Sequence, residues 1–255
     1  MQILGVIPAR FKSTRLEGKP LVDICGKPMI QHVYERARSA SSLGEVIVAT
    51  DDARIARAVE GFGGKAVMTS PEHSTGSDRV AEVVRSLDVD VVVNIQGDEP
   101  LIDPILINEC IQPLKVDPFA GVVTVARRIS EEAAYGDPAV VKVVWNLAGK
   151  ALYFSRSLIP FPRSCAQGIR VYEHIGIYAY TKDILMRFTR LSPSPLEIVE
   201  GLEQLRLLEN EIPIHVVQTC CTCPYLSVDT PQDLARARQI MAAGPEMRCV
   251  SEARP

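Results

Sequence analysis

A short loop near the start of the chain gathers most of the positive charge available for binding an anion. The segment PARFKSTRLEGKP follows an apolar run and carries Arg10, Lys12, Ser13, Arg15 and Lys19. In open α/β sheets ligands bind at the carboxyl ends of strands, where this loop would lie. Several cations, a hydroxyl and backbone N–H groups suit a triphosphate, although a solvated charged loop fits the composition too. The loop is not a Walker A motif, because Ser13 and Pro20 replace its first glycine and its hydroxyl residue.

Two carboxylates follow other predicted strands. Asp98 lies in NIQGDEP, directly after the apolar run Val89–Ile95, and Asp229 lies in VDTPQDL. Proteins usually hold Mg²⁺ through one or two carboxylates together with substrate phosphates, so both are candidate metal ligands. Helix capping is the alternative role for each. The Asp88-x-Asp90 pair precedes its strand and therefore belongs to the opposite end of the sheet.

The segment HSTGSDR predicts the start of a helix. Thr75 and Asp78 have the spacing of a capping box, with Asp in place of the usual Glu or Gln. Arg79 in the first turn opposes the helix dipole, so its presence needs a further reason. Binding an anion or the edge of a nucleobase would be such a reason.

Two further patterns are compatible with either a site or ordinary structure. In HIGIYAY, His174, Gly176, Tyr178 and Tyr180 alternate onto one strand face, which would offer a sugar a hydrogen-bonding surface. A structural histidine is the alternative. In PLEIVEGLEQLR the glutamates at 197, 200 and 203 recur every three residues before Arg206, which is typical of a solvated helix face with an i, i+3 ion pair.

The elements that would position these residues alternate between strands and helices in the first half of the chain. We expect strands at 3–7, 46–49, 65–68, 89–95 and 122–126, and helices at 29–40, 53–62, 77–87 and 104–113. This order predicts an α/β fold with a mostly parallel central sheet and helices on both faces. Strands at 140–145, 151–154 and 174–180 without intervening helices predict a small antiparallel patch. We also expect a single helix at 194–210, whose core face is formed by Leu196, Val199, Leu202 and Leu205. The prediction ends with a strand at 214–218 and a helix at 230–241.

Composition limits the possible functions of the chain. Its 255 residues are 47% apolar, enough for a real core, and the net charge of −3 provides no broad basic field for nucleic acid or membrane. No apolar run reaches 18 residues, and the N-terminus does not resemble a signal peptide. Seven irregularly spaced cysteines indicate a reducing compartment. Cys220, Cys221 and Cys223 suggest zinc, but no second pair completes a site, so we expect ordinary cysteines at a strand end.

Taken together, the motifs resemble those of the CMP-Kdo synthetases, the 3-deoxy-manno-octulosonate (Kdo) cytidylyltransferases. The similarity runs from about residue 3 to 241 and is carried by IPARFKSTRLEGKPL, IVATDD, HSTGSDRVAEV, NIQGDEP, AVVKVV, ALYFSRSLIP, HIGIYAY, SPLEIVEGLEQLR and VDTPQDL. The segment CCTCPYLS before Asp229 has more cysteines than this family leads us to expect.

This resemblance implies a cytoplasmic homodimer with a nucleotide-diphospho-sugar transferase type of sheet. The expected organisation is one domain over 1–243, with an inserted dimerisation lobe at about 127–182 and a flexible tail at 244–255. The implied reaction joins CTP and Kdo to give CMP-Kdo and pyrophosphate, with Mg²⁺ as cofactor, for lipopolysaccharide biosynthesis. A different sugar-activating or glycosyl-transferring enzyme and a catalytically silent nucleotide-binding protein remain alternatives.

The resemblance also assigns roles to individual residues. Those expected to be catalytic are Arg10, Lys19, Asp98 and Asp229, of which Asp98 and Asp229 would bind the metal. The nucleotide would contact Arg10, Ser13, Arg15, Lys19, Thr75 and Arg79. The sugar would contact Gln96, Arg156, His174, Tyr178 and Glu203.

Overall fold

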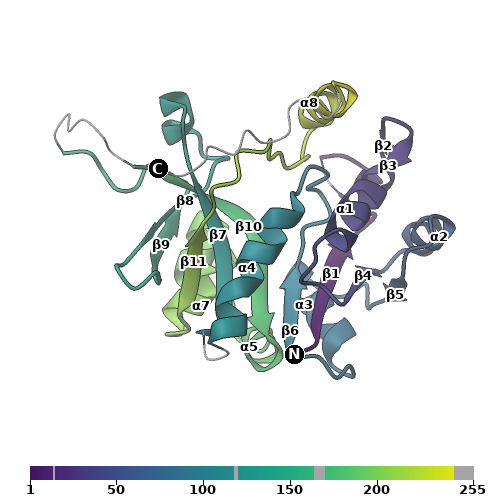
Figure 1. The fold of residues 1–255 in the computed structure, drawn as a ribbon, viewed down its shortest axis with the longest axis horizontal. Helices are drawn as coiled ribbons and strands as arrows, with labels where there is room; N and C mark the ends of the chain where they lie inside the picture. Colours follow the sequence, from purple (N-terminus) through teal and green to yellow (C-terminus); the bar gives the residue numbers. More distant parts are fainter. Residues whose placement is uncertain (14, 118–119, 164–169, 244–255) are drawn as a thin grey trace. The chain divides into compact units, whose positions relative to one another are not determined.

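The computed structural model describes residues 1–13, 15–117, 120–163 and 170–243 (Figure 1). Within it the chain forms two compact units, one comprising Met1–Asn108 and the chain from Cys221 onward, the other Glu109–Cys220. The single domain expected over 1–243 therefore stays a prediction. The tail expected at 244–255 lies outside the described residues.

The first unit is built on four parallel strands in the order β6-β1-β4-β5 (Figure 1). The two inner strands are almost continuous runs of buried aliphatic side chains, as expected for strands covered on both faces. The bounds are β1 (Ile3–Ala9), β4 (Glu45–Thr50), β5 (Ala66–Met68) and β6 (Val91–Asn94).

The order of the strands places the helices of this unit. From β1 to β4 and on to β5 the chain moves in one direction through α1 (Met29–Arg38) and α2 (Ala53–Gly61), then returns to β6 through α3 (Gly76–Val84). Because such crossovers are right-handed, α3 lies on the face opposite α1 and α2. The predicted parallel sheet with helices on both faces is confirmed for this unit.

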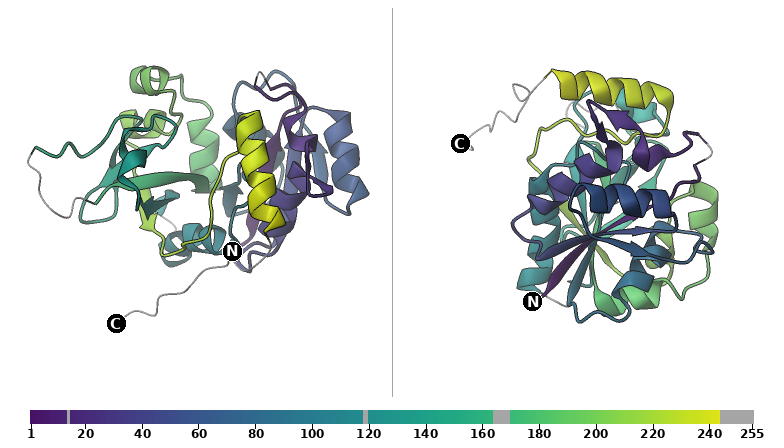
Figure 2. Two further views of the ribbon diagram at one scale, coloured as in Figure 1. Left: turned by 90° about the horizontal axis from the view of Figure 1, so that it is seen from above. Right: turned by 90° about the vertical axis from the view of Figure 1, so that its right-hand side faces the viewer.

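A small layer closes the first unit. It consists of η1 (Lys19–Leu21), the hairpin β2 (Asp23–Ile24) and β3 (Lys27–Pro28), and the last helix, α8 (Pro231–Ala242). The right-hand view of Figure 2 shows α8 in yellow beside this hairpin. Ile24, Met29, Val228, Leu234 and Ala237 form a buried apolar cluster that fixes the helix in place.

The second unit has a mixed sheet. β7 (Val122–Arg128) pairs in parallel with β11 (Ile214–Gln218) and antiparallel with β10 (Tyr172–Thr181). The short strands β8 (Lys142–Trp145) and β9 (Ala151–Ser155) pair antiparallel with each other, and β8 also pairs with β10. They form the antiparallel patch that the sequence predicted. The remaining elements are α4 (Pro104–Val116), which starts in the first unit, η3 (Glu132–Gly136), α5 (Lys182–Phe188), α6 (Pro195–Glu200) and α7 (Leu205–Glu209).

The single helix predicted over 194–210 is wrong. Gly201 adopts a left-handed conformation with φ of 63° and ends α6, so the chain changes direction before α7. The predicted core face is therefore only half correct: Leu202 and Leu205 are buried, but Leu196 and Val199 are 39% and 83% exposed. Arg206 pairs with Glu197 rather than with the glutamate three residues before it.

The sequence also gave no sign of α5 or of the β2–β3 hairpin. Both are short, and periodicity is a weak signal at that length. Among the described helices, none combines the length and the apolar composition needed to cross a bilayer.

Candidate active site

The ammonium group of Lys19 lies between the two carboxylates that the sequence singled out. Its Nζ is 2.6 Å from Asp98 Oδ2 and 2.8 Å from Asp229 Oδ1. Arg15 reaches the same Asp229 oxygen at 3.0 Å. Asp98 and Asp229 therefore converge on one cation although 131 positions separate them in the sequence.

Backbone contacts bring the two carboxylates together. The N–H of Val228 donates to the Asp98 carbonyl at 2.9 Å, which holds the two segments side by side. Thr230 and Asp233 form a capping box at the start of α8, and the Asp233 carboxylate also accepts the N–H of Asp229. A side chain at Gly97 would put its Cβ 2.8 Å from the Pro8 carbonyl, so this glycine lets the Asp98 segment approach the end of β1.

The loop that carries Lys19 is folded onto itself. The N–H of Gly18 donates to the Phe11 carbonyl at 3.1 Å, and the guanidinium of Arg54 stacks 3.3 Å above the centre of the Phe11 ring. Asp52 in turn caps α2 and pairs with Arg54. The cationic loop is thus held against the start of α2 by a cation–π contact, and the ion pair with Asp52 orients the Arg54 guanidinium.

The electrostatics of the cluster favour a charged lysine. Burial by itself lowers the pKa of Lys19, but the nearby Asp98 and Asp229 outweigh it, and the pKa of Lys19 is raised above its usual 10.5. Its side chain is only 13% exposed, so the attraction is weakly screened. Lys19 is therefore protonated throughout the physiological pH range.

The other predicted nucleotide contacts lie in the same unit. Arg10 donates to the Ser74 carbonyl at 2.6 Å, which brings the cationic loop to the HSTGSDR segment. Ser13 accepts the N–H of Leu16 at 3.4 Å. The predicted capping box is confirmed, because Thr75 and Asp78 exchange hydrogen bonds at the start of α3.

Arg79 is fully buried and has a protein partner. Its guanidinium donates to Asp51 at 3.0 Å and to the hydroxyl of Thr69. The ion pair explains why a cation is tolerated in the first turn of α3, for which the sequence analysis had offered a bound ligand as one reason. Its Nε has no partner among the described residues, and the contact predicted between Arg79 and the nucleotide stays a prediction.

Four of the predicted sugar-binding residues belong to the second unit, and three of them, His174, Tyr178 and Glu203, lie close together. The imidazole of His174 is 5.3 Å from the Tyr178 ring, centre to centre, and its Nε2 is 3.0 Å from the Thr124 hydroxyl. β10 is irregular between Ile175 and Tyr178. The β7 partners of His174 and Tyr178 are Ala126 and Thr124, which are two residues apart, so His174 and Tyr178 share a face as predicted. Glu203 interacts electrostatically with Tyr178.

Burial sets the protonation of this group. It lowers the pKa of His174 to about 3, so the imidazole is neutral at neutral pH. For Tyr178, burial and then the nearby Tyr180 and Glu203 raise the pKa well above 10, so the hydroxyl keeps its proton. Both side chains can therefore donate and accept hydrogen bonds without carrying charge.

Arg156 is tied to the backbone of its own unit. Its guanidinium donates to the carbonyls of Pro138 at 2.9 Å, Glu200 at 2.8 Å and Gly201 at 3.4 Å. Its own N–H donates to the Glu200 carboxylate, and its carbonyl accepts from the buried ammonium of Lys142. Gln96 belongs to the first unit, where its amide donates to Asn94 at 3.4 Å.

Comparison with known proteins identifies the family. Residues 4–214 match the family model described as Cytidylyltransferase. The chain belongs to this family.

Similar relatives within this family carry the same protein name. The chain is 50% identical over 246 residues to the 3-deoxy-manno-octulosonate cytidylyltransferase of Geobacter sulfurreducens, covering 92% of this chain and 98% of the relative. It is 48% identical over 237 residues to the Escherichia coli protein of that name, covering 93% and 95%. A solved structure of CMP:2-keto-3-deoxy-manno-octonic acid synthetase complexed with CTP superposes with a TM-score of 0.90 at 46% identity, covering 95% and 99%.

Several residues that contact the predicted site residues or their neighbours were not given this role by the sequence analysis. Lys142 and Glu200 hold Arg156, Asp51 pairs with Arg79, and Tyr225 donates to the buried Glu99 next to Asp98. Only Asp51 left a usable signal, since IVATDD places an acid at the carboxyl end of a parallel strand. The others depend on side-chain directions that no spacing rule reveals.

Proposed function

We propose that this chain is a 3-deoxy-manno-octulosonate cytidylyltransferase that converts CTP and Kdo into CMP-Kdo and pyrophosphate for lipopolysaccharide biosynthesis. The observation that carries the proposal is the cluster of Lys19, Asp98 and Asp229 beside Arg15. This cluster offers both cations for phosphate groups and carboxylates for a metal ion, within a family whose relatives bear this activity in their names.

The chemistry is an in-line displacement at phosphorus. The anomeric hydroxyl oxygen of Kdo bonds to the α-phosphorus and its proton passes to solvent, while the bond to the bridging oxygen breaks and pyrophosphate leaves with the electron pair. Such transfers depend on positioning and on neutralising charge. Arg10, Ser13, Arg15 and Lys19 are the groups we assign to the phosphates, with Thr75 and Arg79 assigned to the rest of the nucleotide. Arg10 and Lys19 are the cations we place nearest the reacting phosphate.

The cluster also fits a divalent cation. Asp98 and Asp229 already share one positive charge, the ammonium of Lys19, so their oxygens are arranged to accept a cation between them. Oxygen ligands from two carboxylates, completed by substrate phosphates, are the set that Mg²⁺ prefers. When bound, the ion would neutralise charge on the phosphates. Lys19, released from the carboxylates, is then available to bind a phosphate oxygen.

The sugar is the second part of the proposal. We assign Gln96, Arg156, His174, Tyr178 and Glu203 to Kdo. Neutral His174 and protonated Tyr178 can each donate a hydrogen bond from a buried position, and a buried polar group discriminates strongly against a substrate that leaves it unpaired. Kdo carries a carboxylate next to its reacting carbon, and such a group needs donors of this kind.

We also propose a cytoplasmic homodimer formed by the second unit. Large apolar side chains are exposed on this unit at Leu147, Leu152, Phe161, Ile198 and Val199. Exposed apolar groups in this number favour an interface with a second copy. Val199→Asp, compared with the neutral Val199→Ala, should shift the mass measured by light scattering toward a monomer. An unchanged mass for Val199→Asp would remove this support.

The deciding experiment is a pyrophosphate-release assay with CTP, Kdo and Mg²⁺. Turnover should need all three components. Replacing CTP by UTP, or Kdo by sialic acid, should lower the turnover rate by as much as roughly 10⁴-fold. Equal turnover with sialic acid would overturn the sugar assignment but leave a cytidylyltransferase. No pyrophosphate with either Kdo or sialic acid would overturn the whole proposal in favour of a nucleotide-binding protein.

A further inference from the structure

A second cluster of potential metal ligands lies in the cysteine-rich segment before Asp229. One carboxylate oxygen of Asp103 and the Sγ atoms of Cys221 and Cys223 all lie within 4.8 Å of one another. All three residues belong to the first unit and are partly buried. Sequence spacing gave no third ligand for these cysteines, and the fold provides one from the start of α4.

The types of the ligand atoms select the kind of ion. Two soft thiolate sulfurs together with one carboxylate oxygen favour Zn²⁺, and the two sulfurs disfavour Mg²⁺. In a tetrahedral zinc site with bonds of about 2.3 Å to sulfur, the ligand atoms stand about 3.8 Å apart. The observed limit of 4.8 Å is close enough that small side-chain rotations would reach that spacing.

The carboxylate is held in place before any ion arrives. Asp103 Oδ1 accepts the N–H of Ile105 at 2.8 Å at the start of α4. This bond restrains the side chain, and a preorganised ligand loses little entropy on binding an ion. The three ligand atoms also leave a fourth tetrahedral position for water or another group.

The oxidation state of Cys223 limits when the site can form. Cys223 is disulfide-bonded in the structure, and a disulfide sulfur is not a thiolate ligand. A thiol reductant must therefore act first: it gives two electrons to the disulfide, the S–S bond breaks, and the reductant becomes oxidised to a disulfide itself. Zinc then replaces the thiol protons of Cys221 and Cys223, which pass to solvent.

We propose that the reduced protein binds one Zn²⁺-class ion through Asp103, Cys221 and Cys223, and that oxidation of Cys223 abolishes this site. The site ties the start of α4 to the segment that leads into Asp229, where Val228 is already bonded to Asp98 and Tyr225 to Glu99. The ion therefore restrains the chain on either side of the two carboxylates without binding to them.

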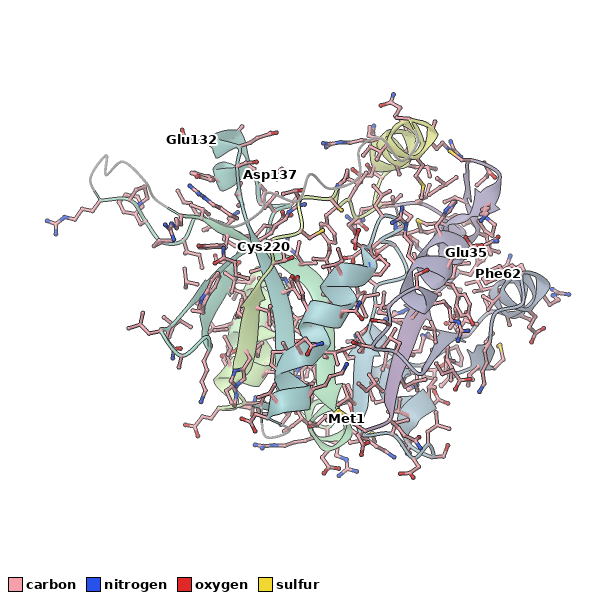
Figure 3. All side chains as sticks on the ribbon, in the orientation of Figure 1. Met1, Glu35, Phe62, Glu132, Asp137 and Cys220 are labelled. Atoms are coloured by element: carbon pink, nitrogen blue, oxygen red, sulfur yellow. The ribbon has the colours of Figure 1, made fainter. Side chains whose placement is uncertain are left out.

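Co²⁺ is the probe that tests this inference, because cobalt bound to thiolate absorbs in the near ultraviolet whereas cobalt bound only to oxygen does not. Full-length reduced protein should show this absorption with one ion per chain, and Zn²⁺ should displace it. Cys221→Ser should remove the band, and Asp103→Asn should weaken binding at least about tenfold. Cys220→Ser is the matched control, because Cys220 lies just beyond the end of β11 (Figure 3) and is not among the three ligands.

Other outcomes would overturn the inference. These are the absence of the band in reduced wild-type protein, an equal band after oxidation, or a band lost in Cys220→Ser and kept in Cys221→Ser. The comparison of reduced with oxidised wild type needs no variant, so it holds even where a substitution impairs folding. A double Asp98→Asn, Asp229→Asn variant should keep the band, which separates this site from the carboxylate pair of the proposed reaction.

Discussion

The two charged regions of the molecule are held in opposite ways. Around Lys19 the charged groups bind one another: one ammonium joins Asp98 and Asp229, and Arg15 joins Asp229. Around Arg156 the cations bind backbone, since Lys142 donates to the carbonyls of Asp137 and Val140 as well as to Arg156. The first region can exchange its partners by side-chain rotation alone. In the second the acceptors are backbone carbonyls, whose positions are set by the fold.

This difference matches the two tasks that we propose. A site that binds triphosphate must give up its internal ion pairs, and the phosphates and a metal ion would supply the charges that replace them. A site that recognises a sugar gains from groups fixed in advance, because ordering them on binding would cost affinity. Substitutions in the first region should therefore change rates and leave the fold intact, whereas substitutions in the second should change stability as well.

The largest expected effect is that of Asp98→Asn. It keeps the size of the side chain but removes a charge from the proposed metal site, so turnover in the pyrophosphate assay should fall by about 10³ or more. The melting temperature should stay close to that of the wild type. Activity near the wild-type level in Mg²⁺ would show that Asp98 is not a metal ligand.

Lys19→Ala should have the next largest effect. Loss of one preorganised contact to developing charge typically costs about 10²–10³ in rate, so kcat at saturating CTP should fall by that factor. Lys12→Ala in the same loop is the matched control, and it should change kcat far less. If Lys19→Ala raised only KM, the lysine would act in uniform binding of the nucleotide instead.

In the second region the informative change is Lys142→Met. It keeps the apolar stem but leaves three backbone carbonyls without their charged donor, which should cost about 2–3 kcal/mol of unfolding free energy, measured by urea denaturation. Because Arg156 would lose its anchor, KM for Kdo should rise while KM for CTP stays the same. Lys150→Met, at an exposed position, is the control. Equal stability of the two variants would mean that the backbone contacts of Lys142 are not stabilising.

The smallest expected effect concerns pH. The pKa of His174 is about 6.5 when unfolded and about 3 when folded, so the unfolded chain binds the proton first. The stability contributed by neutral His174 is therefore complete above pH 6.5 and is lost as the pH falls toward 3. His174→Gln should show a shallower decline of melting temperature from pH 7 to 4.5 than the wild type. His32→Gln is the comparison, and parallel declines in all three proteins would argue against this account.

What the sequence could predict follows the same division. Asp98 was predictable from its place after the parallel strand β6. Asp229 does meet it as predicted, but not for the predicted reason, because β11 ends at Gln218 and no described strand leads directly into Asp229. The role of Lys19 as the bridge between them was not predictable, because a long side chain in a loop can point in many directions. In the second region the glutamates at 197, 200 and 203 had a convincing helical spacing, and Gly201 broke it. Glu200 consequently accepts a hydrogen bond from the backbone N–H of Arg156 rather than from solvent.

Arg79 shows a different limit. A cation at the start of α3 needs a compensating negative charge, and several kinds of partner could supply it. A carboxylate from the loop after β4 does so inside the protein. Sequence alone cannot choose between an internal counter-ion and a ligand, because that choice depends on which loops meet.

The ammonium that joins Asp98 and Asp229 has a thermodynamic consequence for the order of events in the proposed reaction. A divalent ion that binds alone must compete with Lys19 for the two carboxylates. A nucleotide phosphate that binds alone must draw Lys19 away from both carboxylates, which leaves two negative charges facing each other. When both arrive together, each removes the obstacle to the other. The two ligands are therefore expected to bind with positive coupling, and by linkage each should tighten the other by the same factor.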